Sequence, residues 1–369
     1  MFGEYRLAKT RLFDKVYGSL IGGAIGDALG GPVEKYSHEE LMKKYGVVDR
    51  FLPYERAETM HGHFGEGDCI GVYTDDTRLK HLYCEAILRA EGIPRTGHLT
   101  EVLIEAYQHA PREINKAFIE EYYLKSIWRE DKVIFSGEPT NGAIIGNSPL
   151  GIILACKPYE AYQLGFDLGW FAEGYAKTAA AIMAAAVSES IRSNATVESI
   201  IQTAKDSHIT FSRKREGKYW QELEWRYDPN ITFLEAAVTI AQKEHDVFKI
   251  REPLYELLEW GHLFSEATHT LVVALSMFVA ARGNFEKTVI GCVMYGRDKD
   301  SYASVGGALA GAFGGAKSIR TDWIETVVKA NPEPDMYSLA EKICSLIELQ
   351  HIKDQTDIEA VNYLLNHES

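Results

Sequence analysis

Residues 11–30 combine the apolar pattern of an α-helix with a face that carries no side chains. Gly18, Gly22, Gly26 and Gly30 recur at every fourth position and so share one side of the predicted helix. Each glycine costs a helix about 1 kcal/mol relative to alanine. Four in register therefore predict the close approach of a neighbouring backbone or of a ligand, and the sequence does not decide between the two.

Much of the remaining sequence is also helical in pattern. Residues 174–192 are rich in alanine, and residues 195–205, residues 231–247 and the chain from residue 264 onwards read as further helices. Alternating strand patterns are absent from the sequence, as are a GxGxxG turn after a strand and a GKS/T phosphate loop. We predict an all-α fold, a compact orthogonal multi-helix array rather than a simple bundle.

No linker or fixed-period repeat divides the sequence, which predicts a single domain over residues 1–369. A polar and aromatic segment near 208–230 has no apolar period and is expected to be a surface excursion. Its basic residues would suit a nucleic acid, but the formal net charge of −14 repels nucleic-acid backbones and anionic membranes. We expect neither as a partner, and the sequence does not indicate an oligomeric state.

The cysteines bear on the compartment. They are dispersed without a CxxC or other metal-binding spacing, at Cys69, Cys84, Cys156, Cys292 and Cys344. An odd and scattered set favours reduced thiols and a cytoplasmic location over a disulfide framework. No uninterrupted apolar run is long enough to span a bilayer.

Two acidic clusters each open a helical pattern. The first is Thr-Asp-Asp-Thr at 74–77, followed by apolar residues at helical spacing from Leu79. Thr74 or Asp75 is a natural N-cap, and acids in a first turn favour the helix dipole. Capping would explain this cluster if it stood alone. The second cluster, Asp-Lys-Asp-Ser at 298–301, pairs acids with a hydroxyl in the same way.

Together the two clusters offer only oxygen ligands, which Mg²⁺ and Mn²⁺ prefer. Adjacent acids diverge and can each hold one of two ions, and four facing carboxylates would repel one another strongly without cations. We predict a site for two divalent ions, most often Mg²⁺ or Mn²⁺ in such chemistry, with these ligands: Thr74, Asp75, Asp76, Asp298, Asp300 and Ser301.

Two other acids and a histidine pair could also contribute to a site. Asp27 lies within the apolar small-residue run and Glu34 follows a Gly-Gly-Pro break, and a buried acid needs a partner. His61 and His63 invite a metal interpretation, but no third ligand lies at a suitable spacing, so that alternative is less favoured.

A segment rich in turn residues, 136–149, is flanked by apolar residues and is expected to fold inward as a loop. Such loops can present backbone N–H groups to phosphates or sugars. The candidate substrate contacts in it are Asn141, Gly142, Gly146, Asn147 and Ser148.

These motifs, in this order, resemble the ADP-ribosylglycohydrolase family, which includes dinitrogenase-reductase-activating glycohydrolases and hydrolases of ADP-ribosyl-arginine, ADP-ribosyl-serine and acyl-ADP-ribose. The matching pieces are Gly22-x3-Gly26-Asp27-x2-Gly30-x3-Glu34, Thr74-Asp75-Asp76-Thr77, Asn141-Gly142 to Pro149, and Gly296-Arg297-Asp298-Lys299-Asp300-Ser301.

The resemblance implies an all-α fold with a binuclear Mg²⁺ or Mn²⁺ centre held by the two acidic clusters. It also implies that Glu34 acts near the scissile bond or gates the cleft, and that the 141–148 segment holds a ribose and a diphosphate. The expected reaction is hydrolysis of the ribosyl C1 bond of an ADP-ribosylated protein or a related ADP-ribosyl compound. Glu34 and Asp76 are the candidates for activating water.

Several positions depart from the family pattern, and three of them bear on the substrate and the metal site. Arg297 replaces a glycine, Lys299 lies between the two acids, and Gly146 stands where arginine is common. A lysine beside a dication must point away from it or pair with a substrate phosphate. The missing arginine favours, as an alternative, hydrolysis of a small N-riboside or nucleoside-like metabolite. A further alternative is a catalytically silent ADP-ribose-binding or structural homologue.

Overall fold

The computed structural model describes residues 10–34, 36–55, 58–59, 62–63, 69–109, 139–170, 172, 174–214, 229–259 and 264–367. Within these residues the protein is almost entirely helical, and the all-α prediction is confirmed. The exception is a two-residue antiparallel hairpin, in which β1 (Glu58–Thr59) pairs with β2 (Gly62–His63).

The helices follow one another along the chain as α2 (Arg11–Gly30), η1 (Gly31–Val33), α3 (His38–Tyr45), α4 (Asp75–Arg89), α5 (Thr96–His109), α7 (Gly142–Gly146), α8 (Ser148–Ile153), α9 (Pro158–Leu168), α10 (Tyr175–Ser190), α11 (Val197–Lys214), α13 (Asn230–Glu244), α14 (Arg251–Leu257), α15 (Ala267–Ala280), α16 (Phe285–Tyr295), α17 (Lys299–Gly314), η2 (Ala316–Ser318), α18 (Thr321–Ala330) and α19 (Met336–Asn366).

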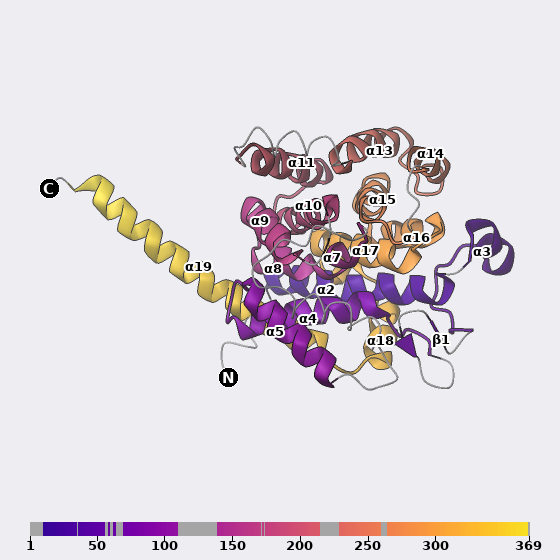
Figure 1. The fold of residues 1–369 in the computed structure, drawn as a ribbon, viewed down its shortest axis with the longest axis horizontal. Coiled ribbons are helices and arrows are strands. Elements are labelled where there is room, and N and C mark those ends of the chain that lie inside the picture. The colour runs from indigo at the N-terminus through magenta and orange to yellow at the C-terminus, as the bar shows by residue number, and fades with distance from the viewer. Residues whose placement is uncertain are drawn as a thin grey trace.

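Helices α2 and α17 form the centre of the fold, and the glycine face of α2 is their contact (Figure 1). A Cβ atom built on Gly18 would lie 2.5 Å from the carbonyl oxygen of Gly311, and one on Gly22 would lie 2.6 Å from that of Gly307. On Gly26 it would overlap the carbonyl of Ala303. The glycines therefore serve backbone contact with a second helix, which resolves the choice that the sequence left open.

A second buried layer surrounds this pair. Every residue of α15 is buried, and α10 packs its alanine-rich surface against α8, α9 and α15. In Figure 1, α11, α13 and α14 form one edge of the body, while α5 and α18 lie on the opposite side of α2. Small side chains allow the helix axes to approach closely, so the core is dense rather than wide.

The regions expected to be irregular contain more helix than the sequence suggested. α3 begins with a capping box between Ser37 and Glu40, and the turn-rich segment after residue 139 folds into the short, fully buried helices α7 and α8. α11 continues to Lys214 and buries His208 against Tyr162, so a surface excursion does not begin at residue 208. Residues 215–228 of the predicted excursion lie outside the described residues.

The last helix leaves the body of the protein (Figure 1). The first half of α19 buries Met336, Leu339 and Ile343 and packs against α2, α4 and α8. Asp354 is paired with Lys157, and the helix beyond it is exposed. None of the helices in the described part of the chain is both long and apolar enough to cross a bilayer.

Candidate metal centre

The first half of the site is the start of α4, which a buried carboxylate holds in place. Thr74 caps this helix, and its Oγ1 accepts a 3.4 Å hydrogen bond from the N–H of Asp76. Asp27 of α2 is fully buried and accepts from the N–H groups of Thr74 and Thr77, both at 2.9 Å, and from Thr77 Oγ1 at 2.5 Å. The expectation that Asp27 needs a partner is thus confirmed: it satisfies N–H groups of the helix start, which have no partner within the helix.

The second half is the start of α17. Gly296 and Arg297 have φ angles of 104° and 56°, so the chain turns sharply before Asp298, the N-cap position. Asp298 Oδ2 accepts a 2.8 Å hydrogen bond from Asn141 Nδ2. Asp300 lies against the end of α2, where a Cβ on Gly30 would be 2.4 Å from its Cα. The last glycine of the α2 face therefore lets Asp300 reach the first half-site.

The two halves meet through their hydroxyl and carboxylate groups. Thr74 Oγ1 donates to Asp300 Oδ2 at 3.4 Å, and Ser301 Oγ donates to Asp76 Oδ2 at 3.3 Å. Clusters more than 220 residues apart in the sequence thus form one group, with separations of 226 and 225 residues for the two bonds.

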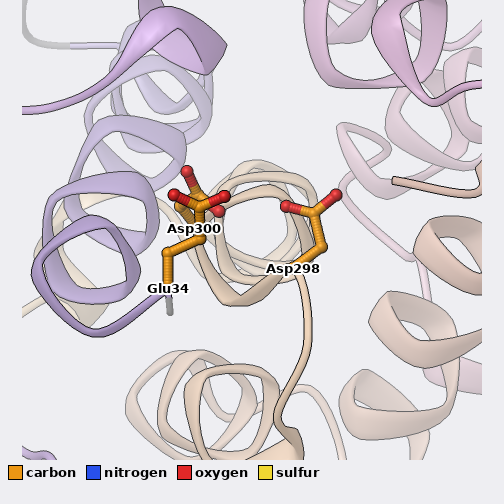
Figure 2. A group of neighbouring side chains, drawn as sticks. All are labelled: Glu34, Asp298 and Asp300. Carbon is orange, nitrogen blue, oxygen red and sulfur yellow. The ribbon is translucent and has the colours of Figure 1, made fainter. Parts of the chain in front are cut away.

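Glu34 joins this group from the turn that follows α2. Carboxylate oxygens of Glu34, Asp298 and Asp300 lie within 4.8 Å of one another, and all three side chains are buried. In Figure 2, Glu34 and Asp300 lie together and Asp298 points toward them from the other side of the start of α17.

Burial and mutual repulsion dominate the electrostatics of the acids. The pKa values of Asp75, Asp76 and Asp298 are raised well above the ordinary range, first by burial and then by the charge of Asp300. Lys80 opposes this rise at Asp76, although burial lowers the pKa of its own ammonium group. Without a cation, such carboxyl groups favour their protonated form.

The donor set fits a hard divalent cation. Asp76 Oδ1 and Asp300 Oδ1 are buried and have no hydrogen-bond partner among the described residues, which is costly for a carboxylate unless an ion occupies the space beside it. Six acids are buried around the site, against two lysines, Lys80 and Lys299. If all were ionised, the excess would be four negative charges, which is the charge of two divalent ions. The acids are Asp27, Glu34, Asp75, Asp76, Asp298 and Asp300.

Comparison with known proteins identifies the family of this chain. The family model described as ADP-ribosylglycohydrolase matches residues 8–353, nearly the whole chain. The chain belongs to the ADP-ribosylglycohydrolase family. It is therefore a glycosyl hydrolase by family, and the resemblance seen in its motifs is confirmed.

Two curated relatives can be aligned with most of this chain. The uncharacterized protein YegU of Escherichia coli (strain K12) is 24% identical over 83% of this chain and 89% of its own, and an uncharacterized protein of Archaeoglobus fulgidus is 25% identical over 85% and 91%. A solved ADP-ribosylglycohydrolase-related protein complex has the same fold, with a TM-score of 0.61 and 19% identity over 91% of this chain and 99% of the other.

Of the residues expected to contact substrate, Asn141 lies beside the acids of the candidate site, whereas Gly146 and Asn147 contact other helices. Asn141 reaches the metal centre, since its amide bonds both Asp298 and Thr270. Gly146 instead packs into α4, where a Cβ would lie 2.6 Å from the ring of Tyr83, so the position has no room for a side chain. Asn147 donates to the carbonyl of Ala180, and Ser148 is buried. Gly142 begins α7.

Several residues near the site were not anticipated. The hydroxyl of Tyr54 donates to Val72 O at 3.0 Å, and a Cβ on Gly31 would meet both Tyr54 and Thr74. Burial raises the pKa of Glu266, which caps α15, to about 7. Lys80 also lies near these acids, and its position could be predicted from the sequence because it follows Asp76 by one helical turn. The roles of the others depend on contacts between distant segments.

A cavity of about 520 Å³ lies beside the start of α4 but contains none of these acids. Tyr73, Arg78, His81 and Asn331 line it. Its walls connect the 69–74 segment to the chain between α18 and α19, and Asn331 holds that segment by accepting from Tyr73 N–H and donating to Gly71 O.

Proposed function

We propose that the protein is a divalent-metal-dependent glycohydrolase that cleaves the ribosyl C1 bond of an ADP-ribosylated protein or a related ADP-ribosyl compound. The observation that carries this proposal is the meeting of two distant acid-and-hydroxyl clusters, in which Asp76 Oδ1 and Asp300 Oδ1 are buried without a hydrogen-bond partner among the described residues. Membership of the family supports the glycosidic chemistry.

The cations would be held by the oxygens of both clusters, namely Thr74, Asp75, Asp76, Asp298, Asp300 and Ser301, with Mg²⁺ or Mn²⁺ as the ions expected for such donors. When bound, divalent ions supply positive charge that orients hydroxyl groups and makes a water molecule more acidic.

Glu34 and Asp76 are the side chains proposed to act on the reacting groups. Departure of the group on C1 leaves positive charge on the ribosyl ring, and water then adds to C1 and gives up a proton. A carboxylate can stabilise that charge and accept that proton. Glu34 is nearly buried beside Asp298 and Asp300, and Asp76 is fixed by Ser301, so both are preorganised.

The deciding experiment is product analysis on a substrate panel. ADP-ribosyl-arginine peptide, ADP-ribosyl-serine peptide and simple nucleosides are incubated with the protein in Mg²⁺, in Mn²⁺ and in EDTA. We expect release of ADP-ribose that requires a divalent ion, and loss of that activity in Asp75→Ala and Asp300→Ala. Undiminished activity in either variant would contradict the binuclear site.

A small N-riboside is the second candidate substrate. It is favoured by the close packing of Gly146 on Tyr83, which leaves no arginine at that position to bind a diphosphate. Hydrolysis of the nucleosides alone would support it. Calorimetric titration with Mn²⁺ separates both from a silent homologue, for which we would expect no metal binding and no product.

A further inference from the structure

Lys299 makes contacts that the neighbouring acids do not explain. It stands between Asp298 and Asp300 in the sequence and is completely buried. Its Nζ donates to the main-chain carbonyl oxygens of Glu34 at 3.3 Å, of Arg297 at 3.4 Å and of Tyr36. An ammonium group has three N–H donors, so three acceptors satisfy it completely.

These contacts join two segments that carry parts of the site. Lys299 is the first residue of α17, whereas Glu34 follows the single turn η1 and Tyr36 precedes α3. Within the turn itself, the N–H of Glu34 bonds Gly31 O at 3.4 Å, and the N–H of Tyr36 bonds Val33 O at 3.0 Å. The ammonium group therefore ties a short turn to the helix that bears Asp298 and Asp300.

We propose that Lys299 is a positioning residue that holds the Glu34 carboxylate beside Asp298 and Asp300 by binding the main-chain carbonyl groups of Glu34 itself and of Tyr36. The charge of the lysine also offsets one of the three carboxylates gathered there. Its effect on hydrolysis rests on the proposed role of Glu34, whereas its effect on the turn does not.

The test compares Lys299→Met with Lys287→Met. Lys287 lies in α16 and its side chain is exposed to solvent. Amide hydrogen exchange is measured residue by residue on the full chain. In Lys299→Met we expect the amides of Glu34 and Tyr36 to exchange at least tenfold faster, while those of Thr74 and Thr77, which bond Asp27, keep their protection. Lys287→Met should change neither pair.

Equal acceleration at all four amides would show a general loss of stability and overturn the proposal, as would no change at Glu34 and Tyr36. If Lys299→Met does not fold, Lys299→Gln keeps two N–H donors and should give an intermediate acceleration at the same two amides. No acceleration in folded Lys299→Gln would equally overturn it.

A double-variant comparison tests the link to catalysis. If the panel yields an active substrate, Lys299→Met should lower kcat about tenfold or more with KM nearly unchanged, and should cause little further loss in a Glu34→Gln background. Independent, multiplicative losses would show that Lys299 does not act through Glu34. If no substrate is cleaved, the proposed function fails while the exchange result still decides the role of Lys299.

Discussion

The two halves of the candidate metal centre are fixed by side chains of opposite charge. At the start of α4 a carboxylate, Asp27, accepts from main-chain N–H groups, whereas at the start of α17 an ammonium group, Lys299, donates to main-chain carbonyls. Each answers the local need of buried backbone: a helix start has spare donors and a turn has spare acceptors. Consequently Asp27 adds a negative charge to the first half, whereas the positive charge of Lys299 partly neutralises the acids of the second half.

The largest effect should come from separating both halves at once. Gly26→Ala places a Cβ inside the carbonyl of Ala303, so we expect α2 and α17 to part, with a loss of about 3 kcal/mol or more in unfolding free energy. Urea titration measures it. Gly97→Ala is the matched control, because its Cβ would meet nothing within 4 Å and should stabilise α5 by up to about 1 kcal/mol. Similar stability of the two variants would contradict the contact.

Removing one charge should separate metal binding from stability. In Asp300→Asn the amide is nearly the same shape but no longer repels Asp75, Asp76 and Asp298, whose pKa values its charge raises. We expect Mn²⁺ affinity to fall at least 100-fold in calorimetry, while the metal-free protein gains about 1 kcal/mol in unfolding free energy. Loss of both affinity and metal-free stability would instead make Asp300 a structural residue.

The opposite supports can then be compared directly. Asp27→Asn keeps one acceptor oxygen and loses the other, so one of the buried donors at the start of α4 is left without a partner. We expect a cost of about 1–3 kcal/mol and faster hydrogen exchange at Thr74 and Thr77, with Tyr36 unchanged. This is the reverse of the pattern expected for Lys299→Met. The same exchange pattern in both variants would mean that the two halves are not held independently.

A further comparison concerns the dependence of metal-free stability on pH. The pKa values of Asp75, Asp76 and Asp298 are higher in the folded state than in an unfolded chain, so the folded state holds more protons once the pH exceeds the ordinary aspartate range. Stability in EDTA should therefore fall as pH rises toward neutrality, by at most about 1.4 kcal/mol per pH unit for each group. Saturating Mg²⁺ should abolish or reverse this trend in thermal melts. A flat profile in EDTA would argue against the raised pKa values.

Local rules predicted the parts of the site that depend on neighbouring residues. The helix over residues 11–30 was predicted at its observed bounds, and Thr74 caps α4 as its hydroxyl and following acids suggested. The shared pattern of acids and a hydroxyl was enough to predict that 74–77 and 298–301 lie together, and hydrogen bonds join the two clusters. The capping box of Ser37 and Glu40 at the start of α3 follows the same kind of local rule.

Other features could not be read from one segment at a time. The partner of the glycine face is α17, and only the folded chain shows that Gly30 admits Asp300. Residues 142–153 contain turn formers yet are helical, because burial against α4 and α10 outweighs their local preference. The direction of Lys299 depends on carbonyl groups 263 and 265 residues away.

The separation of the half-sites along the chain also orders their assembly. The bonds of Asp27 to Thr74 and Thr77 span 47 and 50 residues, so this half can form when about the first quarter of the chain has been made. The bonds that join it to α17 span 225 and 226 residues, and contacts so distant in sequence form slowly. During synthesis the first cluster of acids therefore stays without the second until most of the protein has been made.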